Sequence, residues 1–103
     1  MALIELDNLE QQAVCKGRRE SLGAVEFACL GKLLRYPDEV LSREELKMAA
    51  VSDTSTLTDR KLDASMKKIG KAVAALWPAY PLVRFVFPDG YVYTERPPKK
   101  KPE

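Results

Sequence analysis

The sequence predicts an α+β fold with an N-terminal antiparallel sheet, three helices and a C-terminal β-hairpin. Two observations predict the helices: Ser42 and Glu45 form the two ends of a capping box, and apolar residues recur at helical spacing between Leu62 and Leu76. The turn sequence Pro88-Asp89-Gly90 between two apolar runs predicts the hairpin. The 103 residues, 46% of them hydrophobic, suffice for one compact domain, which we expect over residues 1–95.

The N-terminal segment, residues 3–21, consists of short runs in which apolar and polar residues are mixed. Turn signals at Asp7-Asn8 and Lys16-Gly17 separate these runs. Short runs bounded by turn residues are typical of β-strands. We therefore expect two or three antiparallel strands before the first helix.

Two helices are predicted next. Over residues 23–35 apolar residues recur at i, i+3 and i+7, and Tyr36-Pro37-Asp38 ends this pattern. In the capping box that follows, the Ser42 side chain caps a backbone N–H of the first turn and the Glu45 side chain reaches back. Leu41 and Leu46 flank the box at the positions of a hydrophobic staple, so a second helix is expected over residues 43–50.

The third helix is the longest predicted element. The segment between Val51 and Asp59 is rich in Ser, Thr and Asp, and we expect this loop to deliver Thr58 or Asp59 as the cap of a helix over about residues 59–76. Apolar residues then recur at i, i+4, i+7, i+11 and i+14, which places them within about 40° of one line along the helix. This buried stripe consists of Leu62, Met66, Ile69, Val73 and Leu76.

The opposite face of the third helix is cationic. From Arg60 to Lys71 the sequence holds five basic residues against one acid, Asp63. The net charge of +2 is also uneven: residues 1–59 hold seven basic and eleven acidic residues (−4), and residues 60–103 hold ten and four (+6). Lysines on an exposed helix also serve solubility, but clustered cations without compensating acids favour a polyanionic partner. A helix about 10 Å wide with one basic face fits the major groove of double-stranded DNA.

The last part of the sequence predicts a hairpin and a tail. Pro78 and Pro81 end the third helix, and apolar runs over residues 82–87 and 91–95 flank the predicted turn. Residues 96–103 are rich in Pro and Lys, and we expect them to form a disordered basic tail.

Composition excludes several classes of function. The chain has no histidine and two cysteines, Cys15 and Cys29, so we expect packed thiols, no structural zinc site and no cofactor. No nucleophile has an evident activating partner, so we do not expect an enzyme. Apolar runs fall short of the roughly 20 residues that span a bilayer, and no signal peptide is evident, so we expect a cytoplasmic, nucleoid-associated protein without membrane contact.

Many of these residues fall at the positions of a known family pattern: Leu22, Glu26, Phe27, Leu30, Pro37, Val40, Leu41-Ser42-Arg43-Glu44-Glu45-Leu46, Arg60, Leu62, Asp63, Met66, Ile69, Gly90 and Tyr91. With them the sequence resembles the effector domain of the OmpR/PhoB family of winged helix-turn-helix regulators. The match runs without a gap from Leu22 through about Val73. The resemblance implies a four-stranded N-terminal sheet, three helices and a hairpin wing. Usual members carry a receiver domain ahead of the effector, and we expect none in this sequence.

The resemblance also implies a function, that of a sequence-specific transcriptional regulator that binds double-stranded DNA with its third helix in the major groove. Phosphates would be contacted from the start of the helix and along its length, and bases from its middle. The hydroxyl of Tyr91 would reach a phosphate or, in the other interpretation, pack within the hairpin, and Asp63 would hold neighbouring groups in place. The expected DNA-binding residues are Arg43, Arg60, Lys61, Ala64, Ser65, Lys67, Lys68, Lys71, Arg84 and Tyr91.

Three positions depart from the family pattern. Phe87 stands where wings carry a minor-groove arginine, Gly70 where the helix carries a further arginine, and Val51 where a tryptophan is frequent. One interpretation is that Arg84, nearby on the same strand, partly replaces the wing arginine in the minor groove. We expect instead that Phe87 closes the hydrophobic core. Gly70 also lowers helix stability by up to about 1 kcal/mol relative to alanine.

These departures leave two other functions open. One is a protein-interaction module whose DNA site has decayed and whose hydrophobic wing, consisting of Phe85, Phe87, Tyr91 and Tyr93, docks on a partner. The other is a protein that coats DNA without regard to sequence. For a regulator, the resemblance implies two further partners: RNA polymerase, through the loop from Val51 to Asp59, and a second copy, in a head-to-tail dimer on DNA.

Overall fold

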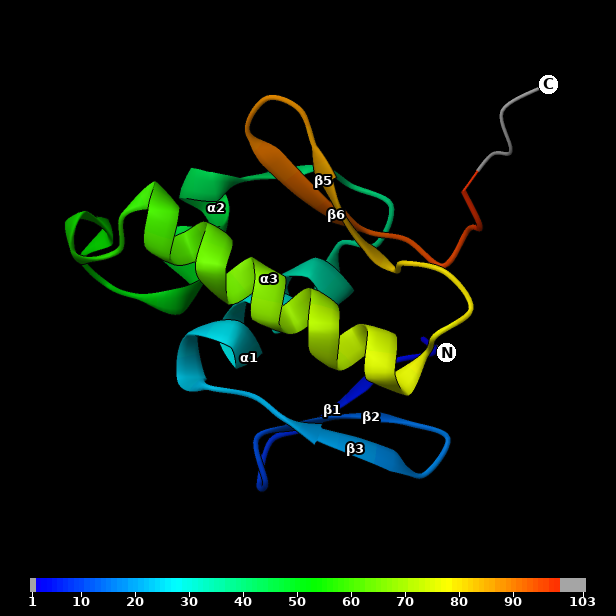
Figure 1. Ribbon diagram of the computed structural model, residues 1–103. Coiled ribbons are helices and arrows are strands. Elements are labelled where there is room, and N and C mark those ends of the chain that lie inside the picture. Colours follow the sequence, from blue (N-terminus) through cyan, green and yellow to red (C-terminus); the bar gives the residue numbers. More distant parts are fainter. Residues whose placement is uncertain (1, 99–103) are drawn as a thin grey trace, which may run out of the picture.

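The computed structural model describes residues 2–98 and has the predicted α+β architecture (Figure 1). The predicted tail therefore lies largely outside the described residues. The second and third helices begin and end at the predicted residues. The elements in chain order are β1 (Glu5–Asp7), β2 (Gln12–Cys15), β3 (Arg18–Ser21), α1 (Ala24–Arg35), β4 (Leu41–Ser42), α2 (Arg43–Ala50), the 3-10 helix η1 (Thr54–Thr56), α3 (Asp59–Leu76), β5 (Val83–Val86) and β6 (Gly90–Tyr93).

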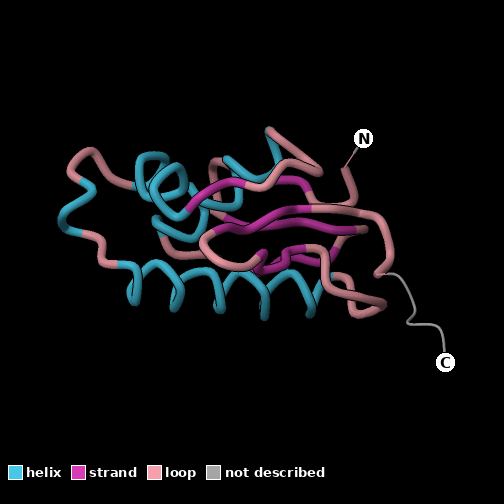
Figure 2. Tube along the Cα trace, turned by 90° about the horizontal axis from the view of Figure 1, so that it is seen from above, coloured by secondary structure: helices cyan, strands magenta, loops and turns pink. Residues whose placement is uncertain are grey.

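The helices lie between two small antiparallel sheets. One sheet has the order β1-β2-β3 and the other the order β4-β6-β5, so that the short strand before α2 pairs with the second strand of the C-terminal hairpin. We call the β5–β6 hairpin the wing. Figure 2, viewed from above, shows α3 along one side of the molecule and the other helices toward the opposite side. No helix between residues 2 and 98 combines the length and the apolar character needed to cross a membrane.

The expectation of a fourth N-terminal strand is wrong, because within residues 2–98 the N-terminal sheet has three strands. The residues before β1 are held by the other end of the domain instead of by a sheet partner. The Leu3 backbone N–H donates to the Glu95 carboxylate at 2.7 Å, and the Ile4 side chain is buried in the core. These contacts direct the chain away from the sheet before Glu5.

The core is built around the predicted stripe of α3. All five stripe residues are buried, and they pack in one cluster with Leu30 and Leu33 of α1 and Leu46 of α2. Both cysteines are free and buried in this cluster, as expected. Burial raises the pKa of the Cys29 thiol to about 11, so this side chain is an uncharged packing group at neutral pH.

Caps fix where α2 and α3 begin. The Ser42 hydroxyl accepts from the Glu45 backbone N–H at 3.1 Å, and the Glu45 carboxylate accepts from the Ser42 N–H at 3.0 Å, which is the predicted capping box. The Thr58 hydroxyl caps α3 by accepting from the Lys61 N–H at 3.2 Å. Because Ser42 also belongs to β4, the start of α2 is tied to the wing.

The expectation that Phe87 closes the core is wrong, because its side chain is 87% exposed. Phe87 follows the last residue of β5 and lies in the turn, beyond the part of the hairpin that packs on the helices. The hydrophobic wing is also smaller than expected. Tyr91 and Tyr93 alternate inward along β6 and are buried, so Phe85 and Phe87 are the exposed pair among the four predicted residues.

The capping box predicts the effect of Ser42→Ala. Loss of the hydroxyl leaves the Glu45 N–H without its acceptor, so we expect the free energy of unfolding to fall by about 1 kcal/mol in urea titrations. Ser52→Ala, at an exposed position of the next loop, is the control and should leave the stability unchanged. Equal stability of the two variants would contradict a role of the box in stabilising α2.

Candidate nucleic-acid interface

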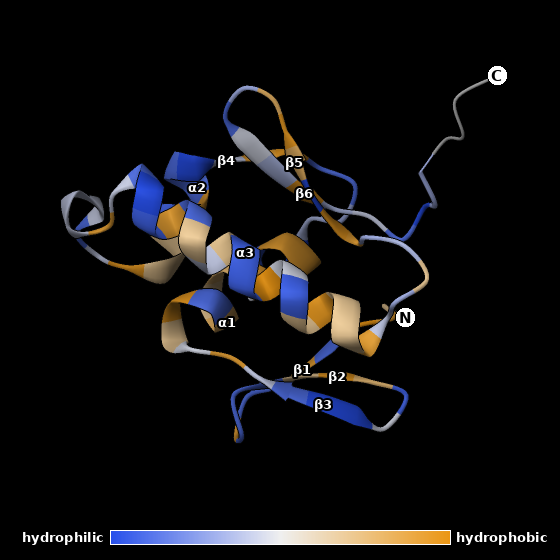
Figure 3. Cartoon of the chain, in the orientation of Figure 1, coloured by the Kyte–Doolittle hydropathy of each residue, from blue (hydrophilic) through white to orange (hydrophobic). Residues whose placement is uncertain are grey.

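The predicted basic residues of α3 lie together on one exposed face. Figure 3 shows hydrophilic residues recurring along this helix. We call this surface the cationic face. Its exposed members are Arg60, Lys61, Ala64, Lys67, Lys68 and Lys71, and Ser65 lies half-buried at its edge. Among the ion pairs within residues 2–98, none involves a cation of this face.

The two acids of α3 do not neutralise this face, because basic residues of α2 pair with them. The Asp59 carboxylate meets the Lys47 ammonium of α2 at 2.6 Å. The Asp63 carboxylate is bound by Arg43, also of α2, through two parallel bonds of 3.0 Å from Nε and a terminal guanidinium nitrogen. The five cations are thus left without intrahelical partners, which favours attraction of an anion over self-neutralisation.

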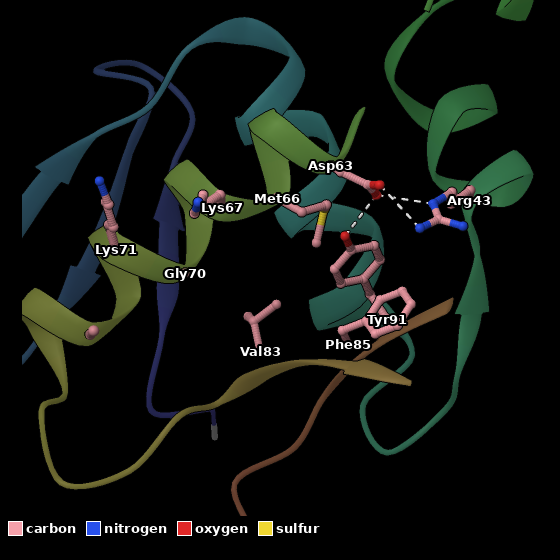
Figure 4. Close-up of a pocket in the computed structure, with 10 residues that line it drawn as sticks. Arg43, Asp63, Met66, Lys67, Gly70, Lys71, Val83, Phe85 and Tyr91 are labelled. Atoms are coloured by element: carbon pink, nitrogen blue, oxygen red, sulfur yellow. Dashed lines mark hydrogen bonds and ion pairs between the residues drawn. The ribbon is translucent and has the colours of Figure 1, made fainter. Parts of the chain in front are cut away.

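Asp63 is the centre of a network that joins α2, α3 and the wing (Figure 4). Besides the two bonds from Arg43, its carboxylate accepts from the Tyr91 hydroxyl at 2.8 Å. The same guanidinium reaches the wing turn, where it donates to the Asp89 carboxylate at 3.3 Å and the Pro88 carbonyl at 3.4 Å. The network confirms the expected structural role of Asp63.

The electrostatics of the network favour its charged form. The hydrogen bonds from Arg43 are the main cause that lowers the pKa of Asp63, and the bond from Tyr91 adds to them. The pKa of Arg43 is raised, chiefly by the hydrogen bonds to Asp63. Burial, and then the bond to Asp63, raise the pKa of Tyr91 to about 12. At neutral pH the carboxylate is therefore ionised while Arg43 and Tyr91 keep their protons.

Three predicted DNA-binding residues lie apart from the cationic face. Arg43 and Tyr91 direct their polar groups to Asp63, and the Tyr91 side chain is buried. Arg84 alternates with Val83 and Phe85 on β5, so it points to the other side of the wing. Its guanidinium donates to the backbone carbonyls of Pro81 and Arg96.

A cleft of about 720 Å³ lies between α3 and the wing. Met66, Gly70 and Ala74 of α3 and Val83 and Phe85 of β5 supply much of its lining, with Lys67 and Lys71 on the helix side (Figure 4). Sequence reasoning missed this cleft. The alternation of Val83 and Phe85 could have placed both on one face of the hairpin, but only the packing of the wing shows that α3 lies opposite.

The network predicts how Asp63→Asn changes stability with pH. Because the folded-state pKa of Asp63 lies below its ordinary value of 3.8, its contribution is present above that value and is lost as the pH falls through the folded-state pKa. We expect the variant to be less stable than the wild type at neutral pH and the difference to shrink on acidification. Thermal unfolding of both proteins over this pH range measures it, and a constant difference would contradict the pairing.

Solved structures with the same fold include DNA-binding domains of response regulators. The C-terminal domain of the nisin resistance regulator NsrR matches with a TM-score of 0.77 at 21% identity, covering 93% of this chain and 96% of that one. The DNA-binding domain of AdeR, in complex with an intercistronic region, gives 0.76 at 19% identity over 93% and 97%. DrrB of Thermotoga maritima, an OmpR/PhoB homologue, gives 0.70 at 26% identity, covering 90% of this chain and 42% of DrrB.

Sequence comparison also gives a curated relative that is a transcriptional regulatory protein. The transcriptional regulatory protein BaeR of Escherichia coli O6:H1 (strain CFT073) is 30% identical over 86 residues, which are 84% of this chain and 36% of BaeR. This chain thus spans about a third of the length of that relative. No family model matches the sequence. The chain therefore has the winged helix-turn-helix fold of the OmpR/PhoB-type response-regulator DNA-binding domains.

Proposed function

We propose that the chain is a transcriptional regulator that binds double-stranded DNA sequence-specifically, with α3 in the major groove. The observation that carries this proposal is the cationic face, whose five basic residues are exposed and make no ion pair within the described part of the chain. The major groove is about 12 Å wide and admits a helix of this diameter. The AdeR domain was solved with DNA, and BaeR is a transcriptional regulatory protein, which supports the proposal.

Each residue of the cationic face has a proposed role. Arg60 and Lys61, at the start of α3, would bind phosphates, and Lys67 and Lys71 would bind phosphates along the helix. Three residues between these positions would face base edges: Ala64, Ser65 and Lys68. We assign Arg43 and Tyr91 a different role, which is to hold α3 against α2 and the wing through Asp63.

Two protein partners and a location belong to this proposal. The loop before α3, with η1 in it, lies at the end of the molecule where α3 begins (Figure 1), so it would lie beside the duplex when α3 is bound. Its mostly exposed residues, from Val51 to Asp59, are the proposed contact with RNA polymerase. Head-to-tail pairing of two copies on repeated half-sites is proposed from the same resemblance. A cytoplasmic, nucleoid-associated location is proposed from the sequence pattern.

Replacement of Lys67 and Lys68 by alanine tests the cationic face. We expect the double variant to bind duplex DNA more weakly in fluorescence anisotropy titrations. The magnitude of the slope of log K against log salt should decrease by about 0.9, since Lys67 is the phosphate-binding residue of the two and each neutralised phosphate contributes about 0.9. A duplex recovered by selection from a random pool is the probe, because it also reports whether binding depends on sequence.

The control for this test is Lys32→Ala combined with Arg35→Ala. It removes the same charge from α1, behind α3, and should leave the salt slope unchanged. Equal losses in both double variants would indicate a net-charge effect rather than a binding face. Failure of the wild type to bind any duplex at low salt would overturn the proposed function.

A second candidate function is docking of a protein at the wing turn. Phe87 is 87% exposed and Val40 is 53% exposed, and both line a shallow pocket of about 250 Å³ together with Pro88. The acidic residues Glu45 and Asp89 line the same pocket. An apolar surface bordered by acids suits a basic protein segment better than a DNA groove.

Phe87→Ser separates the two uses of the wing turn. Because the side chain is exposed, we expect the free energy of unfolding to change by no more than about 0.5 kcal/mol. DNA affinity in the same anisotropy titration should remain that of the wild type. A large loss of DNA affinity would show instead that Phe87 enters the minor groove as an apolar wedge.

A further inference from the structure

Leu9 is an apolar residue that an ordered turn holds out into solvent. It is 96% exposed and lies in the turn between β1 and β2, which projects from the lower edge of the molecule in Figure 1. The Asp7 carboxylate accepts from the backbone N–H groups of Leu9 and Glu10 at 3.0 and 3.1 Å. At the other end of the turn, the backbone and side chain of Gln11 form hydrogen bonds with the Leu22 backbone. The turn is therefore fixed at both ends and keeps Leu9 away from the sheet.

A groove of about 460 Å³, which we call the α1 groove, lies beside this turn. Residues of β1 and α1 supply its apolar lining: Leu6, Phe27, Ala28 and Gly31. Lys32 and Arg35 of α1 add two cations to the lining, and neither makes an ion pair within residues 2–98. The α1 groove thus combines an apolar wall with positive charge that the described part of the chain does not neutralise.

The turn and the α1 groove are complementary to each other. Leu9 is apolar, and the next residue, Glu10, is an exposed acid without an ion pair among the described residues. An apolar side chain followed by an acid matches an apolar groove that carries cations. Asn8 lines the groove, so the two complementary surfaces adjoin on one molecule. Because the turn holds Leu9 in solvent, Leu9 does not fill the groove of its own chain.

We propose that this surface pairs two copies of the chain in a symmetric dimer, with Leu9 of each copy in the α1 groove of the other. A twofold axis beside adjoining complementary surfaces satisfies both contacts at once, as in any isologous interface. Glu10 of each copy then meets Arg35 of the other. Such an interface is small, so its Kd is expected to be on the order of 10 µM. This dimer forms without DNA and is distinct from the head-to-tail pairing proposed on repeated half-sites.

Pairing through the α1 groove leaves α3 free. On the wheel of α1, the groove residues lie opposite Cys29, Leu30 and Leu33, the buried residues of that helix. The core-facing side of α1 packs with the apolar stripe of α3, so the cationic face lies outside the interface. The dimer therefore presents two cationic faces. If the proposed function holds, these would bind two duplexes.

Sedimentation velocity of the full chain without DNA, over a series of protein concentrations, tests the inference. Leu9→Ser removes the side chain that enters the groove, and its exposure means that the fold should persist. Phe87→Ser is the matched control, because Phe87 is 87% exposed and lies in the wing turn, away from the groove. We expect a concentration-dependent dimer in the wild type and in Phe87→Ser. In Leu9→Ser the dimer should be weaker by at least about tenfold.

A charge exchange tests the contact between Glu10 and Arg35. Glu10→Arg and Arg35→Glu each bring like charges together, so each should weaken the dimer by at least about fivefold. The protein that carries both substitutions has the net charge of the wild type and opposite charges at the contact again. Its dimer should regain the wild-type affinity.

Three results would overturn the inference. One is a wild type that stays monomeric at every concentration. The second is loss of the dimer in Leu9→Ser with wild-type association in both charge variants, since that pattern indicates contact between two Leu9 side chains. The third is loss of the dimer in Phe87→Ser, which would place the interface at the wing. All three leave the proposed function standing, and a dimer that binds no duplex would contradict the proposed function alone.

Discussion

The position of α3 depends on the carboxylate of Asp63. It joins three elements that are distant in sequence, because Arg43 begins α2 and Tyr91 belongs to β6. The bidentate geometry of the Arg43 pair fixes direction as well as distance, which a single bond would not do. Because the Arg43 guanidinium neutralises the Asp63 carboxylate, this acid does not offset the cations of α3. The helix therefore gains an anchor and keeps a surface of one charge sign.

Local patterns in the sequence were sufficient for the helices. The capping box at Ser42 and the apolar stripe from Leu62 to Leu76 depend on contacts within one or two turns, and the structure confirms both, with α2 and α3 at the predicted bounds. The exposed cationic face follows from the same periodicity. These features were predictable because the helical repeat decides which side chains point outward.

Contacts between distant segments were the part that sequence patterns did not provide. Phe87 looked like a core residue because it is large and apolar, yet no element packs over the turn in which it lies. Arg43 and Arg84 were expected to bind DNA; the structure shows the Arg43 guanidinium on the Asp63 carboxylate and the Arg84 guanidinium on the carbonyls of Pro81 and Arg96. The cleft at Gly70 likewise depends on how the wing packs beside α3. Each of these features requires knowledge of the tertiary arrangement. The family resemblance gave such a tertiary role for one residue, Asp63.

The contact of Leu3 with Glu95 has a mechanical consequence. One carboxylate oxygen of Glu95 accepts from the Leu3 backbone N–H at 2.7 Å and from the Tyr93 hydroxyl at 2.6 Å. These hydrogen bonds, which we call the terminal clasp, join the first and last described segments. A pulling force applied to the two ends would load this clasp before it reached the helices. The helical core would bear tension only after the clasp had opened, so stretching would begin with a local opening at the ends while α3 and its anchor stayed in place.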